Sequence, residues 1–195
     1  YYSLKEQGDN YEIRFKLNLT NTKPLFDLFY PAVTISKGTI LKGRFSNSRT
    51  SVLEIHSSFD SIKIDNITLS KNEIDLFTSK KRYSNDVLAS YSISSEKQKI
   101  GIKSIAKDFY LSGLWDNTAF TYNSSLSSLG NKNGYKLNGD VKFAADSTIF
   151  KIYNSNFKID NHQLSVVDTN LIGLKGKHIA FEHFELKDHY NNQKH

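Results

Sequence analysis

Three histidines near the C-terminal end have the residue type and spacing that could bind a metal. His178, His183 and His189 are separated as metal ligands in a loop or helix can be. If this segment is a strand, His178 and His183 point to opposite faces of the sheet, because side chains alternate along a strand. The chain has no cysteine, and no cluster of carboxylates completes a ligand set. We therefore expect no metal site and no cofactor.

Three aspartates beside apolar runs, Asp60, Asp65 and Asp75, could be proposed as an acid and base pair. Their Ser, Asn and Lys neighbours favour turns and an outer polar face instead. The nucleophile motif G-x-S-x-G, the P-loop and the dinucleotide motif G-x-G-x-x-G do not occur in the sequence. We expect a protein that is not an enzyme.

The net charge of +6 raises the question of a nucleic-acid partner. Most basic residues stand singly along the predicted strands, and the tightest cluster is Lys80-Lys81-Arg82. This spread favours a polar face in water over a nucleic-acid site, so we expect no nucleic-acid partner. Binding to anionic headgroups or to an acidic partner stays open.

Alternation of apolar and polar residues predicts an all-β chain. From Tyr11 to Leu19 the odd positions are apolar and the even positions are polar. A helix is predicted only near residues 22–30, where Thr22 and Pro24 favour a helix start and Pro31 favours its end. The further predicted strands are Val33–Phe45, Val52–Ser57, Ser61–Leu69, Glu73–Thr78, Val87–Ser94, Ile100–Ile105, Phe109–Trp115, Ala119–Asn123, Tyr135–Ala144, Ile149–Ile152, Asn156–Ile159, Leu164–Val167 and His178–Leu186.

A short motif recurs in three of these strands: Leu, any residue, Gly, any residue, and an apolar residue. Its copies run from Leu41 to Phe45, from Leu111 to Trp115 and from Leu137 to Val141. The three shared residues alternate, so in each copy they point to one face. Glycine weakens a strand, and its use there indicates a bend, a bulge or the close approach of another group. We therefore expect a curved sheet.

A longer repeat runs from Ile62 to Leu76 and again from Phe150 to Val166, and a third copy begins at Ile179. Each complete copy is predicted as strand, turn, strand, turn and strand, with turns at Asn66 and Asn72 in the first copy and at Asn154 and Asn161 in the second. Repeats that cannot close a core alone stack on their neighbours in elongated arrays.

The repeats predict a single segment over residues 1–195 that is incomplete at both ends. Residues 124–134, rich in Ser, Asn and Gly, form the best internal break. This break is either a loop between layers or a soft subdomain boundary.

The C-terminal repeats resemble the TamB family (translocation and assembly module, DUF490) of Bacteroidota, which belongs to the AsmA-like proteins. The family has a segment I-x-x-S-x-x-x-I-x-x-x-x-W-x-[VI], followed by N-x-I-x-x-x-x-x-x-I-x-F-x-x-F-x-L. The matching residues are Ser155, Ile159 and Val166 in the first part and Asn170, Ile172, Ile179, Phe181, Phe184 and Leu186 in the second. Leu164 stands where the family has tryptophan. Residues 29–45 also resemble the G-x-[IL]-x-G-x-[FL] strands of AsmA-like repeats.

This resemblance implies an elongated antiparallel sheet that curls into a U-shaped groove with an apolar interior. It also implies a periplasmic location, in a bridge between the inner and outer membranes of a Gram-negative bacterium. The implied roles are carriage of phospholipid between the membranes and assistance to the assembly of outer-membrane β-barrels. The implied partners are phospholipid acyl chains and a β-barrel partner of the TamA or BamA kind, with membrane contact through parts outside this segment.

Sixteen apolar residues are expected to line the groove, although alternation alone favours the dry core of a sandwich for them. The resemblance favours the groove, and loops at its rim would tolerate headgroups of any kind. A strand-pairing assembly factor and a secreted β-rich scaffold or adhesin remain alternatives. The expected lining residues are Leu41, Phe45, Ile62, Ile64, Leu69, Ile74, Leu76, Leu111, Trp115, Leu137, Val141, Phe157, Ile159, Leu164, Phe181 and Leu186.

Overall fold

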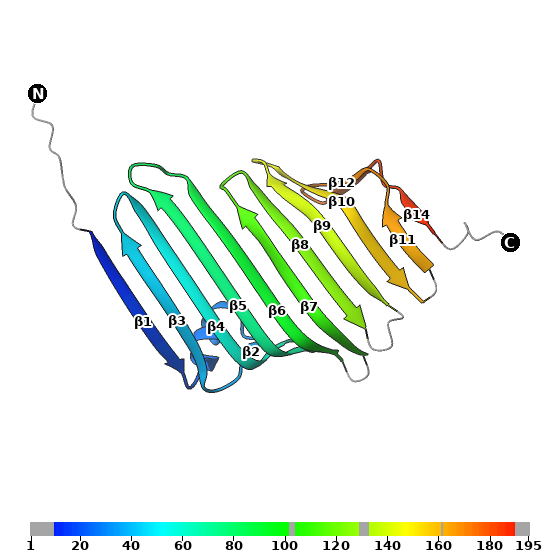
Figure 1. Cartoon of the computed structure of the whole chain (residues 1–195). Helices are drawn as coiled ribbons and strands as arrows, with labels where there is room; N and C mark the ends of the chain where they lie inside the picture. Colours follow the sequence, from blue (N-terminus) through cyan, green and yellow to red (C-terminus); the bar gives the residue numbers. More distant parts are fainter. Residues whose placement is uncertain (1–9, 102–103, 129–132, 161, 190–195) are drawn as a thin grey trace, which may run out of the picture.

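One large antiparallel sheet makes up nearly the whole of the computed structural model (Figure 1), which confirms the predicted all-β class. The structure describes residues 10–101, 104–128, 133–160 and 162–189. Neighbouring strands in the sheet are mostly neighbours in sequence, joined by short hairpin turns. The strands of the main path are β1 (Tyr11–Leu19), β3 (Thr39–Asn47), β4 (Thr50–Ile64), β5 (Ile67–Lys81), β6 (Val87–Ile100), β7 (Ser104–Trp115), β8 (Ala119–Ser128), β9 (Gly134–Phe143) and β10 (Ser147–Ile159).

The sheet divides at both ends of this path. After β10, one branch continues through β11 (His162–Val166) and β14 (Leu186–Asp188), and the other through β12 (Thr169–Lys175) and β13 (His178–Glu182). At the other end, β4 pairs with β3 along one half and with β2 (Val33–Ile35) along the other half. In this way β4 and β10 each pair with two separate strands along one edge.

The predicted helix is α1 (Lys23–Phe29), and it connects β1 to β2. Pro24 lies in its first turn, where the missing N–H costs nothing, and the chain becomes extended at Tyr30 before Pro31. In Figure 1, α1 and β2 lie behind the lower ends of β4 and β5.

A transverse crease crosses the strands and bends the sheet. Lys71 in β5, Asp108 in β7 and Asn154 in β10 adopt positive φ angles of 54°, 54° and 48° respectively. Pairing of β7 with β8 and of β9 with β10 shifts register at this level. Such a shift of register marks a β-bulge, and a β-bulge bends its strand locally.

The buried side chains show which way the sheet bends. Ser57, Asn72, Ser95 and Ser155 are all at most 6% exposed, although the described residues place no second sheet over them. In a single layer, a side chain becomes buried where the sheet folds towards it. The register of the strands places these residues on the same face as the apolar residues. The apolar face is therefore the inside of the crease, and we call it the inner face.

Polar side chains at the crease satisfy backbone groups there. Ser95 Oγ donates to the carbonyls of Ser70 (3.0 Å) and Lys97 (3.2 Å), and Asn72 Nδ2 donates to the carbonyl of Leu69 (3.1 Å). Ser155 Oγ accepts from the Asn138 N–H at 2.9 Å. Backbone polar groups that are buried need such partners, so the crease requires short polar side chains.

Beyond β10, the crease is closed by an asparagine. Asn170 is fully buried, accepts from the Glu185 N–H at 3.1 Å and donates to the Glu185 carbonyl at 3.3 Å. It thereby ties the start of β12 to the segment that leads into β14. Ser155 and Asn170, two polar residues of the family-like motif, thus both have structural roles at the crease.

An aromatic side chain covers each glycine of the recurring motif. Phe15 stands opposite Gly43 and Tyr91 stands opposite Gly113, and Tyr122 stands opposite Gly139. A Cβ atom on any of these glycines would collide with the ring or phenol of its aromatic partner. The tyrosine hydroxyls reach across the glycine strand and donate to the carbonyls of the next strand, Tyr91 to Thr121 and Tyr122 to Lys151. The close approach that the glycines indicated is therefore that of a neighbouring ring.

Several predicted turns are bends within longer strands. Asn72 lies inside the 15-residue strand β5, and Asn154 lies inside the 13-residue strand β10. The prediction of turns at these two residues was wrong, because a polar residue that serves a crease has the same composition signal as a turn. Conversely, the predicted strand Val33–Phe45 is broken at residues 36–38 into β2 and β3.

The predicted internal break at 124–134 lies within the continuous sheet. Residues 124–128 belong to β8, which pairs with β9 up to the contact of Ser127 with Gly134. Residues 129–132 lie outside the described part of the chain.

Gly139→Ala should destabilise the fold, because the new Cβ would collide with the Lys151 carbonyl and the Tyr122 phenol. We expect a loss of about 2–3 kcal/mol in the free energy of unfolding, measured by urea denaturation. Gly173→Ala is the control, since its Cβ would meet only the Ala180 Cβ at 3.9 Å. Equal losses in the two variants would contradict the ring-over-glycine explanation.

Ser155→Val should leave the half-buried Asn138 N–H without its acceptor. We expect a loss of about 2 kcal/mol by the same measurement. Ser112→Val, on the opposite face and half-buried in β7, should change stability little. A Ser155→Val variant as stable as the native chain would show that the crease does not depend on this hydroxyl.

Candidate functional site

The inner face carries continuous rows of apolar side chains that run across the strands. The row nearest the upper strand ends in Figure 1 crosses both the main path and the β12–β13 branch. Its successive members are Ile13, Phe45, Leu53, Thr78, Ala89, Trp115, Phe120, Val141, Phe150, Ile172 and Phe181. Only Thr78 interrupts this apolar row with a hydroxyl.

The described residues leave this apolar face uncovered. Among them, the only buried apolar side chains are Phe59, Ala89, Ala106 and Val141. Ile13 and Phe181, at the two ends of the upper row, are 52% and 62% exposed. Sixteen apolar residues in a sandwich core would be buried by a facing sheet, and here the described strands form one layer.

Nine of the sixteen predicted lining residues lie on the wall above the crease. Leu41, Ile74, Leu111 and Leu137 share one row, and Leu76 belongs to the next row up with Ile55 and Tyr91. The remaining four, in the upper row, are Phe45, Trp115, Val141 and Phe181.

The other seven lie below the crease or on the branch that continues it. Ile62 stands opposite Leu69, and Phe157 stands opposite Leu164. The buried positions Ser95 and Gln98 are three apart, so the alternation shifts by one residue as a strand crosses the crease. The rest of this set are Ile64, Ile159 and Leu186, and the last two are 55% and 40% exposed.

The two walls make a trough with a polar floor and apolar sides. In β7, seven residues separate Asp108 at the crease from Trp115 at the top, or roughly 23 Å at about 3.3 Å per residue. One leaflet of a bilayer has a hydrocarbon layer of roughly 15 Å, half of the membrane core. The upper wall is therefore deep enough to cover an extended acyl chain.

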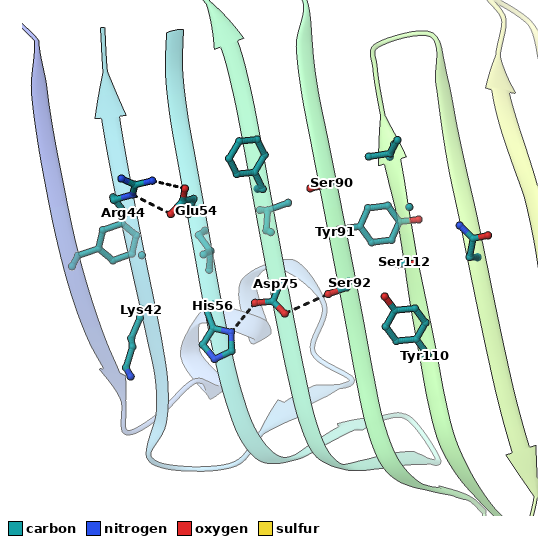
Figure 2. A pocket seen from close by; sticks show the side chains of 18 of the residues that line it. Lys42, Arg44, Glu54, His56, Asp75, Ser90, Tyr91, Ser92, Tyr110 and Ser112 are labelled. Atoms are coloured by element: carbon teal, nitrogen blue, oxygen red, sulfur yellow. Dashed lines mark hydrogen bonds and ion pairs between the residues drawn. The ribbon is translucent and has the colours of Figure 1, made fainter.

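The outer face carries most of the charged side chains of the upper strands and has an open depression of about 980 Å³, drawn in Figure 2. Exposed apolar side chains, Phe77 and Leu114, line it beside the polar ones. Arg44 and Glu54 form a two-bonded ion pair beside it, with N–O distances of 2.6 and 3.0 Å. The hydrogen bond from Arg44 holds the pKa of Glu54 below its ordinary value. The sequence did not predict this depression, although the polar residues that alternate with apolar ones along β3 to β7 indicated a polar outer face.

Within this depression, histidine, aspartate and serine lie side by side on β4, β5 and β6. His56 Nδ1 lies 2.7 Å from Asp75 Oδ1, and Ser92 Oγ donates to Asp75 Oδ2 at 3.4 Å (Figure 2). A nucleophilic serine needs the histidine nitrogen as its base. Here the serine contacts the aspartate, so the arrangement does not activate its hydroxyl.

The other residues considered for chemistry lie apart. Asp65 is in the β4–β5 turn with a φ of 51°, and it accepts from the Tyr30 hydroxyl at 3.3 Å. His178 starts β13 and His183 follows its end, while His189 lies beside β14 and contacts Ser165 Oγ at 2.8 Å. Over the described residues, no three His, Asp or Glu side chains gather as metal ligands. In the same residues, no helix is long and apolar enough to cross a membrane.

Comparison of the chain with protein-family models, with curated proteins and with solved structures finds no match. The resemblance to the TamB family therefore stays a prediction from the motif residues. What the geometry itself defines is an open, creased β-sheet with an uncovered apolar inner face.

Tyr91 should make the stability of the upper wall depend on pH. Burial raises the pKa of Tyr91 to about 12, whereas a tyrosine in an unfolded chain ionises near pH 10. Between these values the unfolded chain binds fewer protons than the folded one, so the free energy of unfolding falls as pH rises. The urea midpoint should therefore drop less in Tyr91→Phe than in the native chain between about pH 9 and pH 12.

The control for this measurement is Tyr83→Phe, because the Tyr83 ring is 90% exposed. It should show the full alkaline drop of the native chain. An equal drop in Tyr91→Phe would show that the Tyr91 phenol does not contribute.

Proposed function

We propose that this chain is a non-enzymatic lipid-carrying segment that holds phospholipid acyl chains along its apolar groove. One observation carries the proposal: the apolar inner face extends from β1 to β13 with no covering layer among the described residues. Apolar surface in water costs about 25 cal/mol per Å², so a face of this extent favours an apolar occupant.

Acyl chains suit this surface better than a peptide or a sugar would. Binding to aliphatic and aromatic walls is non-directional and needs no matched hydrogen bonds. The polar groups at the floor are short and largely engaged with the backbone, as with Ser95 and Ser155. A continuous row that reaches both ends of the sheet also allows a chain to move from strand to strand.

The resemblance to TamB proteins extends this proposal to a cellular setting. It would place the segment in the periplasm, in a bridge that moves phospholipid between the inner and outer membranes. In that setting the segment would act together with an outer-membrane β-barrel, and its anchor in the membrane would lie in other parts of the protein.

A photo-crosslinking amino acid at Leu111 should capture lipid, because this position lies on the inner face of β7. The adjacent residue, Ser112, points to the outer face and lines the depression there, so it is the matched control. After incubation with phospholipid vesicles, mass spectrometry of the irradiated protein should find lipid adducts at Leu111 and few at Ser112. Equal capture at both positions would indicate non-specific contact, and no capture at Leu111 would contradict the groove.

A second candidate function is pairing with another β-strand, as in assembly of outer-membrane barrels. Over the described residues β1 pairs with β3 alone, which leaves the other edge of Tyr11–Leu19 open for a strand. Crosslinkers at edge positions of β1 would then capture protein, while Leu111 would capture no lipid. That result would favour the assembly role over the carriage of lipid.

A further inference from the structure

We propose that the upper rim of the groove binds the anionic headgroups of the phospholipids whose acyl chains lie along the wall below it. The upper rim comprises residues 47–50, 80–88, 115–119, 142–147 and 175–178, where the strands end at the top of Figure 1. This proposal rests on the proposed function and adds a lipid class to it.

Turns that are distant in sequence form one continuous rim. The Arg82 N–H donates to the Arg49 carbonyl at 2.9 Å, which joins the β3–β4 and β5–β6 turns. Asn117 Nδ2 donates to Asp86 Oδ1 at 3.3 Å, which joins the β5–β6 and β7–β8 turns. Further along, Lys175 of β12 pairs with Asp146 of the β9–β10 turn at 2.7 Å.

Exposed basic side chains outnumber acidic ones on this rim. They are Arg49, Lys80, Lys81, Lys142, Lys175 and Lys177, against three aspartates. Over the described residues, Lys175 alone of these six forms an ion pair. Lys80 lies two residues after Thr78 of the upper row and so starts on the inner face, whereas Lys142 and Lys175 alternate with inner-face residues and start on the outer face. A long cationic side chain at the mouth of an apolar trough, such as that of Lys80, is placed to meet a phosphate.

The three aspartates of the rim are engaged within the rim itself. Asp116 accepts from the Thr118 hydroxyl and from the N–H groups of Thr118 and Ala119, and these bonds hold its pKa below the ordinary value. Asp86 accepts from Ser84 Oγ at 2.9 Å and from Asn117, and Asp146 pairs with Lys175. They stabilise the turns, and of the six exposed basic residues only Lys175 forms an ion pair with one of them over the described residues.

Aromatic rings stand between the apolar wall and these cations. Trp115 and Phe143 continue the inner face at its top and are 42% and 65% exposed, and Tyr83 in the next turn is 90% exposed. From crease to rim, the wall is therefore apolar, with exposed aromatic rings near its top, and then basic. A leaflet with anionic lipids has the complementary order, with tryptophan and tyrosine preferring the level between hydrocarbon and headgroup.

The test measures which lipid the protein retains. The chain is incubated with vesicles of equal phosphatidylglycerol and phosphatidylcholine, separated from them, and its bound lipid is quantified by mass spectrometry. We expect phosphatidylglycerol to be enriched roughly 25-fold, since Lys80 and Lys81 near an anionic headgroup are each worth about fivefold in binding. Lys80→Ser with Lys81→Ser should bring the ratio close to one without lowering the total lipid bound.

The matched control removes two lysines from the outer face. Lys16 and Lys42 stand opposite each other on β1 and β3, are exposed, and line the outer depression. Lys16→Ser with Lys42→Ser removes the same charge and should keep the enrichment, with circular dichroism to confirm that both variants fold.

Each other outcome overturns the proposal in a recognisable way. An unchanged ratio in the rim variant would exclude the rim lysines, and an equal loss in both variants would assign the preference to net charge. A rim variant that binds less total lipid at an unchanged ratio would indicate that these lysines dock the protein on the vesicle surface. If no variant retains lipid, the proposed function itself fails, whereas retention without a headgroup preference removes only this inference.

Discussion

The rest of the structure depends on the need to bend one sheet around its own apolar face. An uncovered apolar face is unfavourable in water, and the described strands provide no second layer to cover it. Bending towards that face brings the two walls closer and shields some of the apolar surface, but it disrupts the ladder of hydrogen bonds along the bend. The side chains at the crease follow from this conflict, because they must be short enough for the inside of a bend and polar enough to satisfy the backbone.

The crease meets this demand incompletely. Ser95, Ser155 and Asn170 satisfy backbone donors and carbonyls at the bend. The side-chain carbonyls of Asn72 and Gln98, by contrast, are buried and have no partner among the described residues. A buried acceptor without a partner costs roughly 1–3 kcal/mol. The bend is therefore retained at the expense of local stability, whereas a flat sheet would satisfy its ladder in full and leave the apolar face open.

Much of the fold could be predicted from local pattern, and two of the wrong predictions share one cause. Alternation predicted the strands and the common face of Leu41, Leu111 and Leu137, since residues two apart share a face. The prediction failed at Asn72 and Asn154, where a polar residue serves a bend inside a strand. Composition cannot separate a turn that ends a strand from a crease that the strand crosses. Only pairing with neighbouring strands distinguishes them, and pairing is a property of residues far apart in sequence.

The candidate site, too, could be predicted only in part, because it depends on which strands pair. The lining of each wall follows from alternation, but the one-residue shift at the crease decides whether Ile62 and Leu69 face the same side as Ile74. The rim is less predictable still. Lys80 and Lys81 form a visible cluster in the sequence. Phe143 and Lys177 lie at the same rim only because the turns that follow β5, β9 and β12 all lie at the same end of the antiparallel strands. A charge pattern that is scattered along the sequence therefore becomes a zone at one edge of the wall. Along the strands of this open sheet, the wall therefore changes from apolar above the crease to basic at the rim. Such a change lets a surface orient an amphiphile, whereas a wholly apolar surface would bind it in any orientation.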